Sequence, residues 1–334
     1  MGITRIIDRP GPDAKVQWRE RGERRFLLTV DTEEEFDWSQ PLKRTGHSLD
    51  TIPRLRKFQQ FCEGHSVVPV YLIDYPIATS TLAGEILRDA VIAGRAEVGV
   101  QLHPWVSPPH EEEVTPRNSF AGNLPPKLER DKLLKLRDAI EQNFGAPPLI
   151  YRAGRYGVGP NTAGFLREAG IAIDTSVRSN FDYRAGQGPD FRGFPLEPWW
   201  VGAAGELMEL PLTTLFSGPL RRFGPALYPW LGKLPHGTAL AARLGLLERI
   251  PLTPEGTRID EALRGIDLAI EADLPLLVFS FHSPSLSPGY TPYVRRDAEL
   301  DDFYEWWRRA FEHLARRGVR PTTVREIMAC VALA

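Results

Sequence analysis

Cysteine and excess charge are both scarce in this 334-residue sequence. Its two cysteines, Cys62 and Cys330, lie far apart and form no CxxC motif, so neither a disulfide framework nor a thiolate zinc site is expected. The formal net charge is only -2, which leaves no basic excess of the kind that nucleic-acid-binding proteins carry. We therefore expect buried thiols and no nucleic-acid partner.

Long apolar runs are absent as well. No stretch approaches the roughly 18 consecutive apolar residues of a transmembrane helix, so we expect no membrane span. The opening residues, MGITRIIDRPGPDAK, place acids and prolines where a secretory signal peptide needs an apolar core. With 42% hydrophobic and 25% charged residues, the composition is typical of a globular protein, and we expect a cytoplasmic location.

Short apolar runs, by contrast, recur along the whole chain. They are typical of strands that are buried on both faces, because they lack the polar alternation of a half-exposed strand. Helical patterns separate many of them, as in KLERDKLLKLRDAIEQNFG at 127–145, where leucines recur at helical spacing. The seven expected strands cover residues 26–30, 67–73, 97–102, 149–151, 171–177, 207–213 and 276–281.

Alternating strands and helices predict an α/β fold, and we expect a single domain over residues 1–334 built as a distorted (β/α) barrel with about seven parallel strands. An open doubly wound sheet is the alternative. Its dinucleotide fingerprint is missing, since GRYGVGPNT at 154–162 is neither GxGxxG nor a P-loop. Residues 180–257 are rich in Gly, Pro and aromatics and do not continue the alternation of strands and helices. We expect them to form an insertion that serves as a lid, a substrate-binding wall, a subunit contact or a plain structural element.

Polar residues gather where the expected strands finish. The carboxyl ends of the strands in a (β/α) barrel all open onto one face, so these residues should converge there although they are far apart in sequence. This pattern favours a catalytic site over randomly placed surface polarity. The residues are Asp31, Asp74, His103, Arg152, Asp174 within the fifth expected strand, and His282.

The first strand ends in a run of acids, TVDTEEEFDW, which is either a hydrated surface or the edge of a site. Side chains alternate along an extended segment, so Asp31 and Glu33 should point the same way, as should Gln101 and His103. One carboxylate with one or two groups from QLHPW can hold a divalent metal, and another carboxylate can act as a base. His110, in PPHEE, is a further candidate ligand.

Three other strand-end residues complete a set for water attack on an acyl carbon. Arg152 can hold a carboxylate in its ionised form, and His282 can protonate a departing group while Asp174 orients it. For Arg152 and Asp174 a structural ion pair is the alternative, and for His282 a structural histidine at the barrel mouth.

In this order the motifs resemble the polysaccharide deacetylase family of carbohydrate esterases, the NodB-homology group. The resemblance covers about residues 25–285 and is closest to a bacterial polysaccharide deacetylase-like subgroup. It rests on the acidic motif TVDTEEEFDW, the histidine motif VGVQLHPWVSPP, the arginine motif YRAGRYG, the aspartate motif DTS and the final FSFHSPSLSPG. It implies a seven-stranded distorted barrel, a divalent transition metal (zinc, or else cobalt or nickel) and removal of an N-acetyl group from a saccharide or glycan precursor.

Carried over residue by residue, the resemblance implies catalytic roles and metal contacts for the strand-end groups. Asp31 matches the base, Arg152 the residue that tunes it, Asp174 the orienting acid and His282 the general acid. The expected metal ligands are Glu33, His103 and Gln101, and the expected substrate contacts are Trp105, Tyr156 and Ser283.

The sequence departs from the family pattern at the metal site. Gln101 stands where a second histidine is expected, and an amide oxygen is a weaker ligand for zinc-like ions. Two alternatives to the N-deacetylase therefore stay open. One is an allantoinase-type hydrolase of small amides, and the other is a non-catalytic carbohydrate-binding barrel in which Trp105, Trp199 and Trp200 stack on sugar rings.

Overall fold

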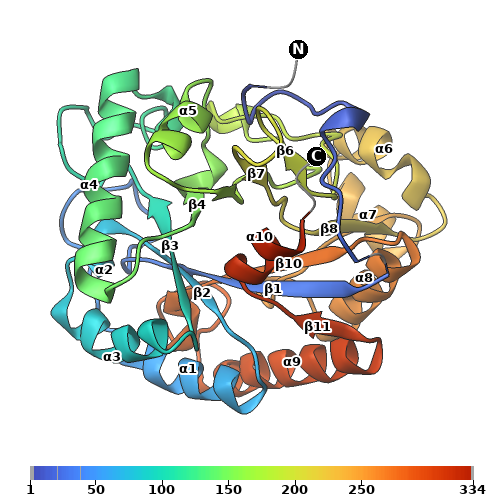
Figure 1. The fold of residues 1–334 in the computed structure, drawn as a ribbon. Helices are drawn as coiled ribbons and strands as arrows, with labels where there is room; N and C mark the ends of the chain where they lie inside the picture. Colours follow the sequence, from blue (N-terminus) through green and yellow to red (C-terminus); the bar gives the residue numbers. More distant parts are fainter. Residues whose placement is uncertain (1–3, 21, 38, 332–334) are drawn as a thin grey trace.

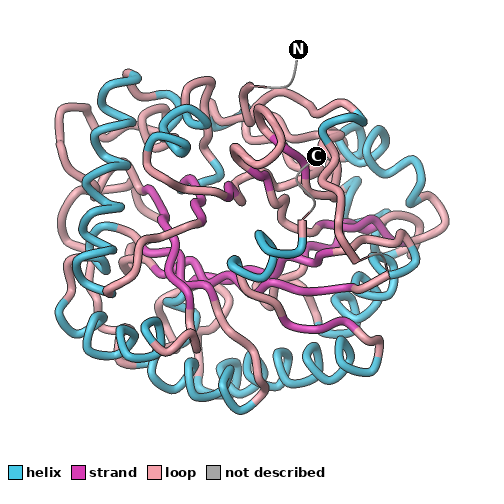
Figure 2. Tube along the Cα trace, in the orientation of Figure 1, coloured by secondary structure: helices cyan, strands magenta, loops and turns pink. Residues whose placement is uncertain are grey.

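The computed structural model describes residues 4–20, 22–37 and 39–331. Strands occupy the centre and helices surround them (Figures 1 and 2). The main sheet runs in the order β10-β1-β2-β3-β4-β5-β7-β6, and β11 pairs with β1. Its strands are β1 (Arg24–Thr32), β2 (Val70–Ile73), β3 (Glu97–Leu102), β4 (Ile150–Ala153), β5 (Ile173–Asp174), β6 (Trp199–Trp200), β7 (Met208–Glu209), β10 (Leu276–His282) and β11 (Val319–Pro321).

Every strand pair of this sheet is parallel except β6 with β7, so seven parallel strands follow one another from β10 to β7. The sheet curls into an incomplete barrel. Beyond β7 the chain returns to β10, where the Thr213 backbone N–H donates to the Val278 carbonyl (3.3 Å) and the Ser280 N–H donates to the Leu252 carbonyl (3.3 Å). The prediction of a distorted (β/α) barrel is confirmed, and each expected strand contains or overlaps an observed one.

Helices cover the outside of the sheet, with α1, α3, α4, α8 and α9 forming most of the outer layer in Figure 1. None of the helices in the described residues combines the length and apolar character that a transmembrane helix requires. The helices are α1 (Arg54–Gly64), α2 (Tyr75–Ala78), α3 (Thr81–Ile92), α4 (Pro126–Phe144), α5 (Thr162–Glu168), α6 (Gly224–Leu231), α7 (Gly237–Arg243), α8 (Ile259–Glu271), α9 (Asp297–Arg316) and α10 (Val324–Cys330).

The stretch 180–257 contains both barrel and non-barrel elements. Strands β6 and β7 belong to the main sheet, whereas β8 (Thr214–Ser217) and β9 (Glu248–Pro251) form a separate antiparallel ribbon. Helices α6 and α7 lie between the two strands of this ribbon in sequence.

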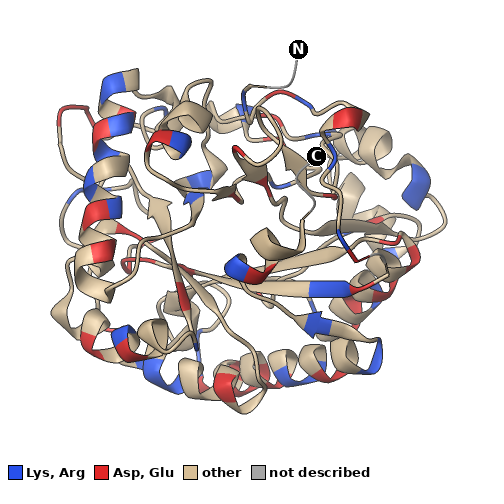
Figure 3. Cartoon of the chain, viewed as in Figure 1, with Lys and Arg blue, Asp and Glu red and all other residues tan. Residues whose placement is uncertain are grey.

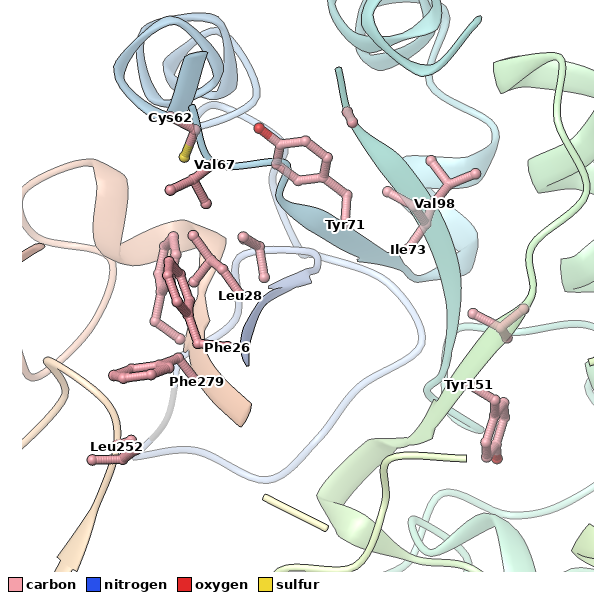
Figure 4. Packing of buried hydrophobic residues seen from close by; sticks show 14 of the residues in the cluster. Phe26, Leu28, Cys62, Val67, Tyr71, Ile73, Val98, Tyr151, Leu252 and Phe279 are labelled. Carbon is pink, nitrogen blue, oxygen red and sulfur yellow. The ribbon is translucent and has the colours of Figure 1, made fainter. Parts of the chain in front are cut away.

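Two apolar clusters pack against opposite faces of the sheet. On β1, Phe26 and Leu28 belong to the outer cluster beneath the helices, which Figure 4 shows from close by, whereas Leu27 belongs to the inner one. The inner cluster also takes Val324 and Ile327 from α10. Because side chains alternate along a strand, Asp31 follows Leu27 on the inner face, at the carboxyl end of the barrel.

Candidate active site

Strand register places three of the predicted catalytic residues and one predicted metal ligand at neighbouring strand ends. Asp31 on β1 lies opposite His282 on β10, and Gln101 on β3 lies opposite Arg152 on β4. All four side chains line one cavity of about 570 Å³ at the carboxyl end of the strands. Of the six strand-end residues expected to converge, Asp31, His103, Arg152 and His282 line this cavity, whereas Asp74 and Asp174 are not among its lining residues.

Asp31 and Arg152 form a buried ion pair, in which Nη1 of Arg152 contacts Oδ1 of Asp31. Two further hydrogen bonds fix the guanidinium, since Nη2 donates to Oγ1 of Thr29 (2.9 Å) and Nε donates to the Thr175 carbonyl (3.1 Å). An arginine fixed by these bonds holds the Asp31 carboxylate in one orientation. Oδ2 of Asp31 lies on the other side, 3.7 Å from Nε2 of His282.

His282 is oriented by Glu255, a residue that the sequence analysis missed. Nδ1 of His282 lies 2.6 Å from Oε2 of Glu255, and the His282 backbone N–H donates to Oε1 of the same carboxylate (3.1 Å). Ser285 Oγ donates to that oxygen as well (2.6 Å). Burial lowers the pKa of His282, but the carboxylates of Glu255, Glu33 and Asp31 outweigh it and raise this pKa well above its usual value. The protonated form of His282 is therefore favoured.

The expectation that Asp174 orients His282 is corrected by this contact. Asp174 lies one strand beyond Arg152, on β5, where its Oδ1 accepts a hydrogen bond from Ser176 Oγ (2.6 Å). Its neighbour across the strand pair is Glu209 on β7. Burial raises the pKa of both carboxyl groups, while the charge of Arg152 lowers it. Asp174 therefore belongs to a buried acidic pair behind Arg152.

His103 is held from one side by acids that follow β1 and β2. Its Nδ1 lies 3.0 Å from Oε2 of Glu34 and 3.9 Å from Oδ2 of Asp74. The indole of Trp105 stacks on the imidazole at 4.3 Å and donates from Nε1 to Oε1 of Glu34 (2.7 Å). The other ring nitrogen, Nε2, lies 3.5 Å from Oε2 of Glu33, which lines the cavity.

Two groups of residues could hold a metal ion. Glu34, Asp74 and His103 bring one ligand atom each within 4.8 Å of one another. Their carboxylates are already occupied, however, because Asp74 accepts hydrogen bonds from the backbone N–H groups of Glu34 (2.8 Å) and Ile77 (2.9 Å). A histidine that binds a metal through one ring nitrogen commonly donates a hydrogen bond from the other ring N–H to a carboxylate. Glu34 is placed to accept that hydrogen bond from His103.

The cavity side of His103 fits a cation better. Oε1 of Glu33 and Oε1 of Gln101 are buried and accept no hydrogen bond from the described residues. Nε2 of His103 lies 3.5 Å from the other oxygen of this carboxylate, Oε2 of Glu33, so the imidazole and the carboxyl group are close enough to share a cation. Gln101 Nε2 donates to Oε2 of Glu33 (3.2 Å), so its amide oxygen is the free end. An imidazole nitrogen and a carboxylate oxygen are ligands that a divalent transition metal takes, whereas the amide oxygen of Gln101 is a weaker one.

Glu33 is a cavity-lining acid whose pKa is clearly raised. Burial raises its pKa to about 8, although the neighbouring His282 and His103 lower it. Without a cation the carboxyl group is therefore largely protonated at neutral pH. A metal would have to displace this proton, which makes binding depend on pH.

The acids of the opening run take different roles. Asp31 and Glu33 face the cavity, Glu34 supports His103, and all three are buried. Glu35 is buried too, and it accepts hydrogen bonds from the backbone N–H groups of Asp50 (2.8 Å) and Thr51 (2.9 Å). Asp37 alone is exposed, so the run is mainly the edge of a site rather than a hydrated surface.

The predicted substrate contacts lie at different depths. Trp105 and Tyr156 line the cavity, whereas Ser283 is buried behind Glu33 and its Oγ accepts the Glu33 backbone N–H (3.2 Å). Trp199 and Trp200 are 1% and 6% exposed, which excludes them as a sugar-stacking surface. The exposed candidate ligand His110 is not among the residues that line the cavity.

Arginine and tyrosine side chains contribute to the wall of the cavity. Arg155 stacks on the ring of Phe120 at 4.5 Å, and Arg178 lies 5.4 Å from the ring centre of Tyr156. Tyr183 and Tyr293 line the same wall. The lining of the cavity thus combines acids and histidines with cationic and aromatic groups, a surface suited to polar ring-shaped ligands.

Comparisons with known proteins address the fold. No protein-family model and no curated protein matches the sequence. A protein assigned as a polysaccharide deacetylase from Mycobacterium smegmatis is 19% identical, with 94% of this chain and 98% of that chain covered and a TM-score of 0.48.

Two other solved structures show how broad this likeness is. A 4-alpha-glucanotransferase from Thermococcus litoralis is 14% identical over 93% of this chain with a TM-score of 0.53, and the match spans 42% of that longer protein. A CE4 family pseudoenzyme from Bacillus anthracis is 10% identical over 92% of this chain and 66% of its own, with a TM-score of 0.44. At these identities the likeness concerns the fold alone.

Proposed function

We propose that this chain is a hydrolase that removes an N-acetyl group from a saccharide or glycan precursor with the help of a divalent transition metal. The observation that carries the proposal is the shared cavity of the Asp31–Arg152 pair, the His282–Glu255 pair and the His103–Glu33 group. It offers a carboxylate base, a protonated imidazole and a cation site within one layer of the barrel. The motif resemblance to polysaccharide deacetylases supports the same reaction.

In the proposed reaction water adds to the acyl carbon, the C–N bond breaks, and an amine and acetate leave. Asp31, fixed by Arg152, takes a proton from the attacking water. His282, held protonated beside Glu255, donates a proton to the departing amine nitrogen. Asp174 supports Arg152 from behind rather than touching His282.

The metal would be held by Nε2 of His103 with the free oxygens of Glu33 and Gln101. When bound, such an ion polarises a carbonyl oxygen and promotes ionisation of water. Trp105 and Glu34 fix the imidazole, and Trp105 keeps water from the back of the ring. Tyr156 and Trp105 on the cavity wall are the proposed contacts to the sugar.

Acetate release from N-acetylglucosamine oligomers, with zinc, cobalt or nickel added, tests this proposal. We expect metal-dependent release, and Asp31→Asn or His282→Ala should lower the rate by about a hundredfold or more while the protein still melts cooperatively. Release from small cyclic amides alone would favour the allantoinase-type alternative. If His282→Ala leaves the rate unchanged, the assigned proton donor is wrong.

Gln101 favours one second candidate, a non-catalytic carbohydrate-binding barrel. A neutral amide that donates to Glu33 at 3.2 Å can close the acidic pocket without any metal. The same cavity would then bind a saccharide through its aromatic and arginine wall. Sugar binding without metal content and without acetate release is the result that this candidate predicts.

A further inference from the structure

Large exposed apolar side chains concentrate on α6, α7 and the loops that flank them. Among the nine that stand out in the described residues, six lie between residues 223 and 246. We call them the α6–α7 surface. They are Phe223 (64% exposed), Trp230 (56%), Leu234 (43%), Leu240 (57%), Leu244 (61%) and Leu246 (40%).

Helix α6 has no polar face at all. Its eight residues, GPALYPWL, contain no charged side chain, and only Gly224 is buried. In Figure 3 the outer helices α4 and α9 carry both acidic and basic positions, whereas α6 is uncharged. A helix that is apolar on every side is normally covered, so this surface needs a partner.

The charged residues within the stretch that contains this surface are all basic. No acidic residue occurs between Glu209 and Glu248, although the whole chain is net negative. The same stretch contains four exposed basic residues, of which Arg221 lies 3.9 Å from Glu271 of α8. The four are Arg221, Arg222, Lys233 and Arg243.

We infer that the α6–α7 surface docks this protein on an anionic lipid bilayer. Apolar side chains that include a tryptophan, flanked by lysine and arginine, are typical of helices that lie in the membrane interface. Basic residues near such a surface are attracted to anionic headgroups. A second copy of the chain is a poorer occupant, because a symmetric contact would place the basic residues of both copies together with no acid of this stretch between them.

The surface lies beside the cavity wall. The ring of Tyr228 on α6 is 4.6 Å from the guanidinium of Arg249, which lies 3.5 Å from the ring of Phe181. Phe181 in turn contacts Arg178 (3.9 Å), which lines the cavity. If the proposed function holds, docking favours saccharides carried on a lipid; the docking itself does not depend on that function.

Sedimentation with lipid vesicles tests this inference. We expect the full chain to bind vesicles of phosphatidylcholine with phosphatidylglycerol at least tenfold more tightly than vesicles of phosphatidylcholine alone, and 0.5 M salt should weaken this binding. The triple variant Trp230→Ser, Leu240→Ser, Leu244→Ser should lose at least tenfold in affinity. The matched control is Leu82→Ser with Ile92→Ser, which removes exposed apolar side chains from α3.

Each other outcome overturns the inference. Absence of binding to the anionic vesicles contradicts it, as does an equal loss of binding in the α3 control. If the parent chain is a dimer in light scattering, the triple variant is a monomer, and the parent chain does not bind vesicles, the surface is assigned to a second copy. Thermal melting of both variants shows that the substituted chains are folded.

Discussion

Glu255 sets the charge of His282, because its carboxylate is the main group that raises the pKa of this imidazole against the effect of burial. Glu255→Gln keeps an oxygen to accept from Ser285 and from the His282 backbone but removes the negative charge. We expect the pKa of His282 to fall, so the alkaline limb of the rate profile moves to lower pH. NMR titration of the His282 ring and the pH dependence of kcat measure both effects.

A matched control for this change is Glu248→Gln, on β9, where the carboxylate pairs with Arg264 at 3.1 Å instead of with the site. It should leave both titrations unchanged. An unaltered pKa of His282 in Glu255→Gln would show that the carboxylate does not govern its charge.

Glu255 was not predictable from the sequence, whereas most of the strand-end set was. Asp31, His103, Arg152 and His282 follow strands that are buried on both faces, and such strands are recognisable as short apolar runs. Glu255 comes instead from the loop after β9, in a stretch without periodic pattern. Only the return of that loop to the barrel mouth brings it to His282.

The predicted weakness of the metal site at Gln101 can be tested by restoring an imidazole. Gln101 lies on the inner face of β3 beside Glu33, with its oxygen unbonded. We expect Gln101→His to raise divalent-metal affinity at least tenfold, about 1.4 kcal/mol. Isothermal titration with zinc measures this, and Gln40→His, elsewhere on the cavity wall, is the control. Equal affinity in Gln101→His and the parent chain would remove Gln101 from the ligand position.

At the scale of elements, the spacing of apolar residues is what allows helices and strands to be predicted from the sequence. Helix α4 was predicted from leucines at helical spacing, and α9 shows the same spacing in Phe303, Trp307, Ala310 and Leu314, all of them buried. The β8–β9 ribbon could not be predicted in this way. Its strands are four residues each, and their pairing depends on contacts across the whole α6–α7 excursion.

Helix α4 contains a carboxyl group that makes the free energy of unfolding depend on pH. Glu129 in its first turn accepts a hydrogen bond from Thr162 Oγ1 of α5, and burial raises the pKa of Glu129 to about 7. The unfolded chain loses this proton near pH 4.5, whereas the folded chain keeps it to about 7. This group therefore makes the free energy of unfolding fall as pH rises through that window, by on the order of 3 kcal/mol.

Glu129→Gln should remove this contribution, because the amide has no proton to lose in that range while its oxygen still accepts from Thr162. Urea unfolding of both chains at pH 5 and pH 8 measures the difference. Other buried acids, such as Asp74, contribute equally to both chains and cancel in the comparison. The same pH slope in Glu129→Gln and the parent would contradict the assignment.

At the scale of the whole molecule, the barrel brings together residues that lie far apart in the sequence. Residues as distant as Asp31 and His282 are opposite one another in the register of β1 and β10. A ligand that joins several strand ends should therefore stabilise the entire sheet. A divalent ion held between His103 on the β3 side and Glu33 on the β1 side is such a ligand.

We expect zinc, cobalt or nickel to stabilise the folded chain against urea, by about 2.7 kcal/mol when the free ion is at a hundred times its dissociation constant. Because Glu33 must lose its proton to bind the ion, this stabilisation should be larger near pH 8 than near pH 6. His103→Ala should abolish it, whereas His110→Ala, at an exposed position, should not. Two results together would show that the cavity holds no cation: micromolar ion does not stabilise the parent chain, and the parent chain and His103→Ala unfold at the same urea concentration. The unbonded oxygens of Glu33 and Gln101 would then be positioned to accept hydrogen bonds from a saccharide.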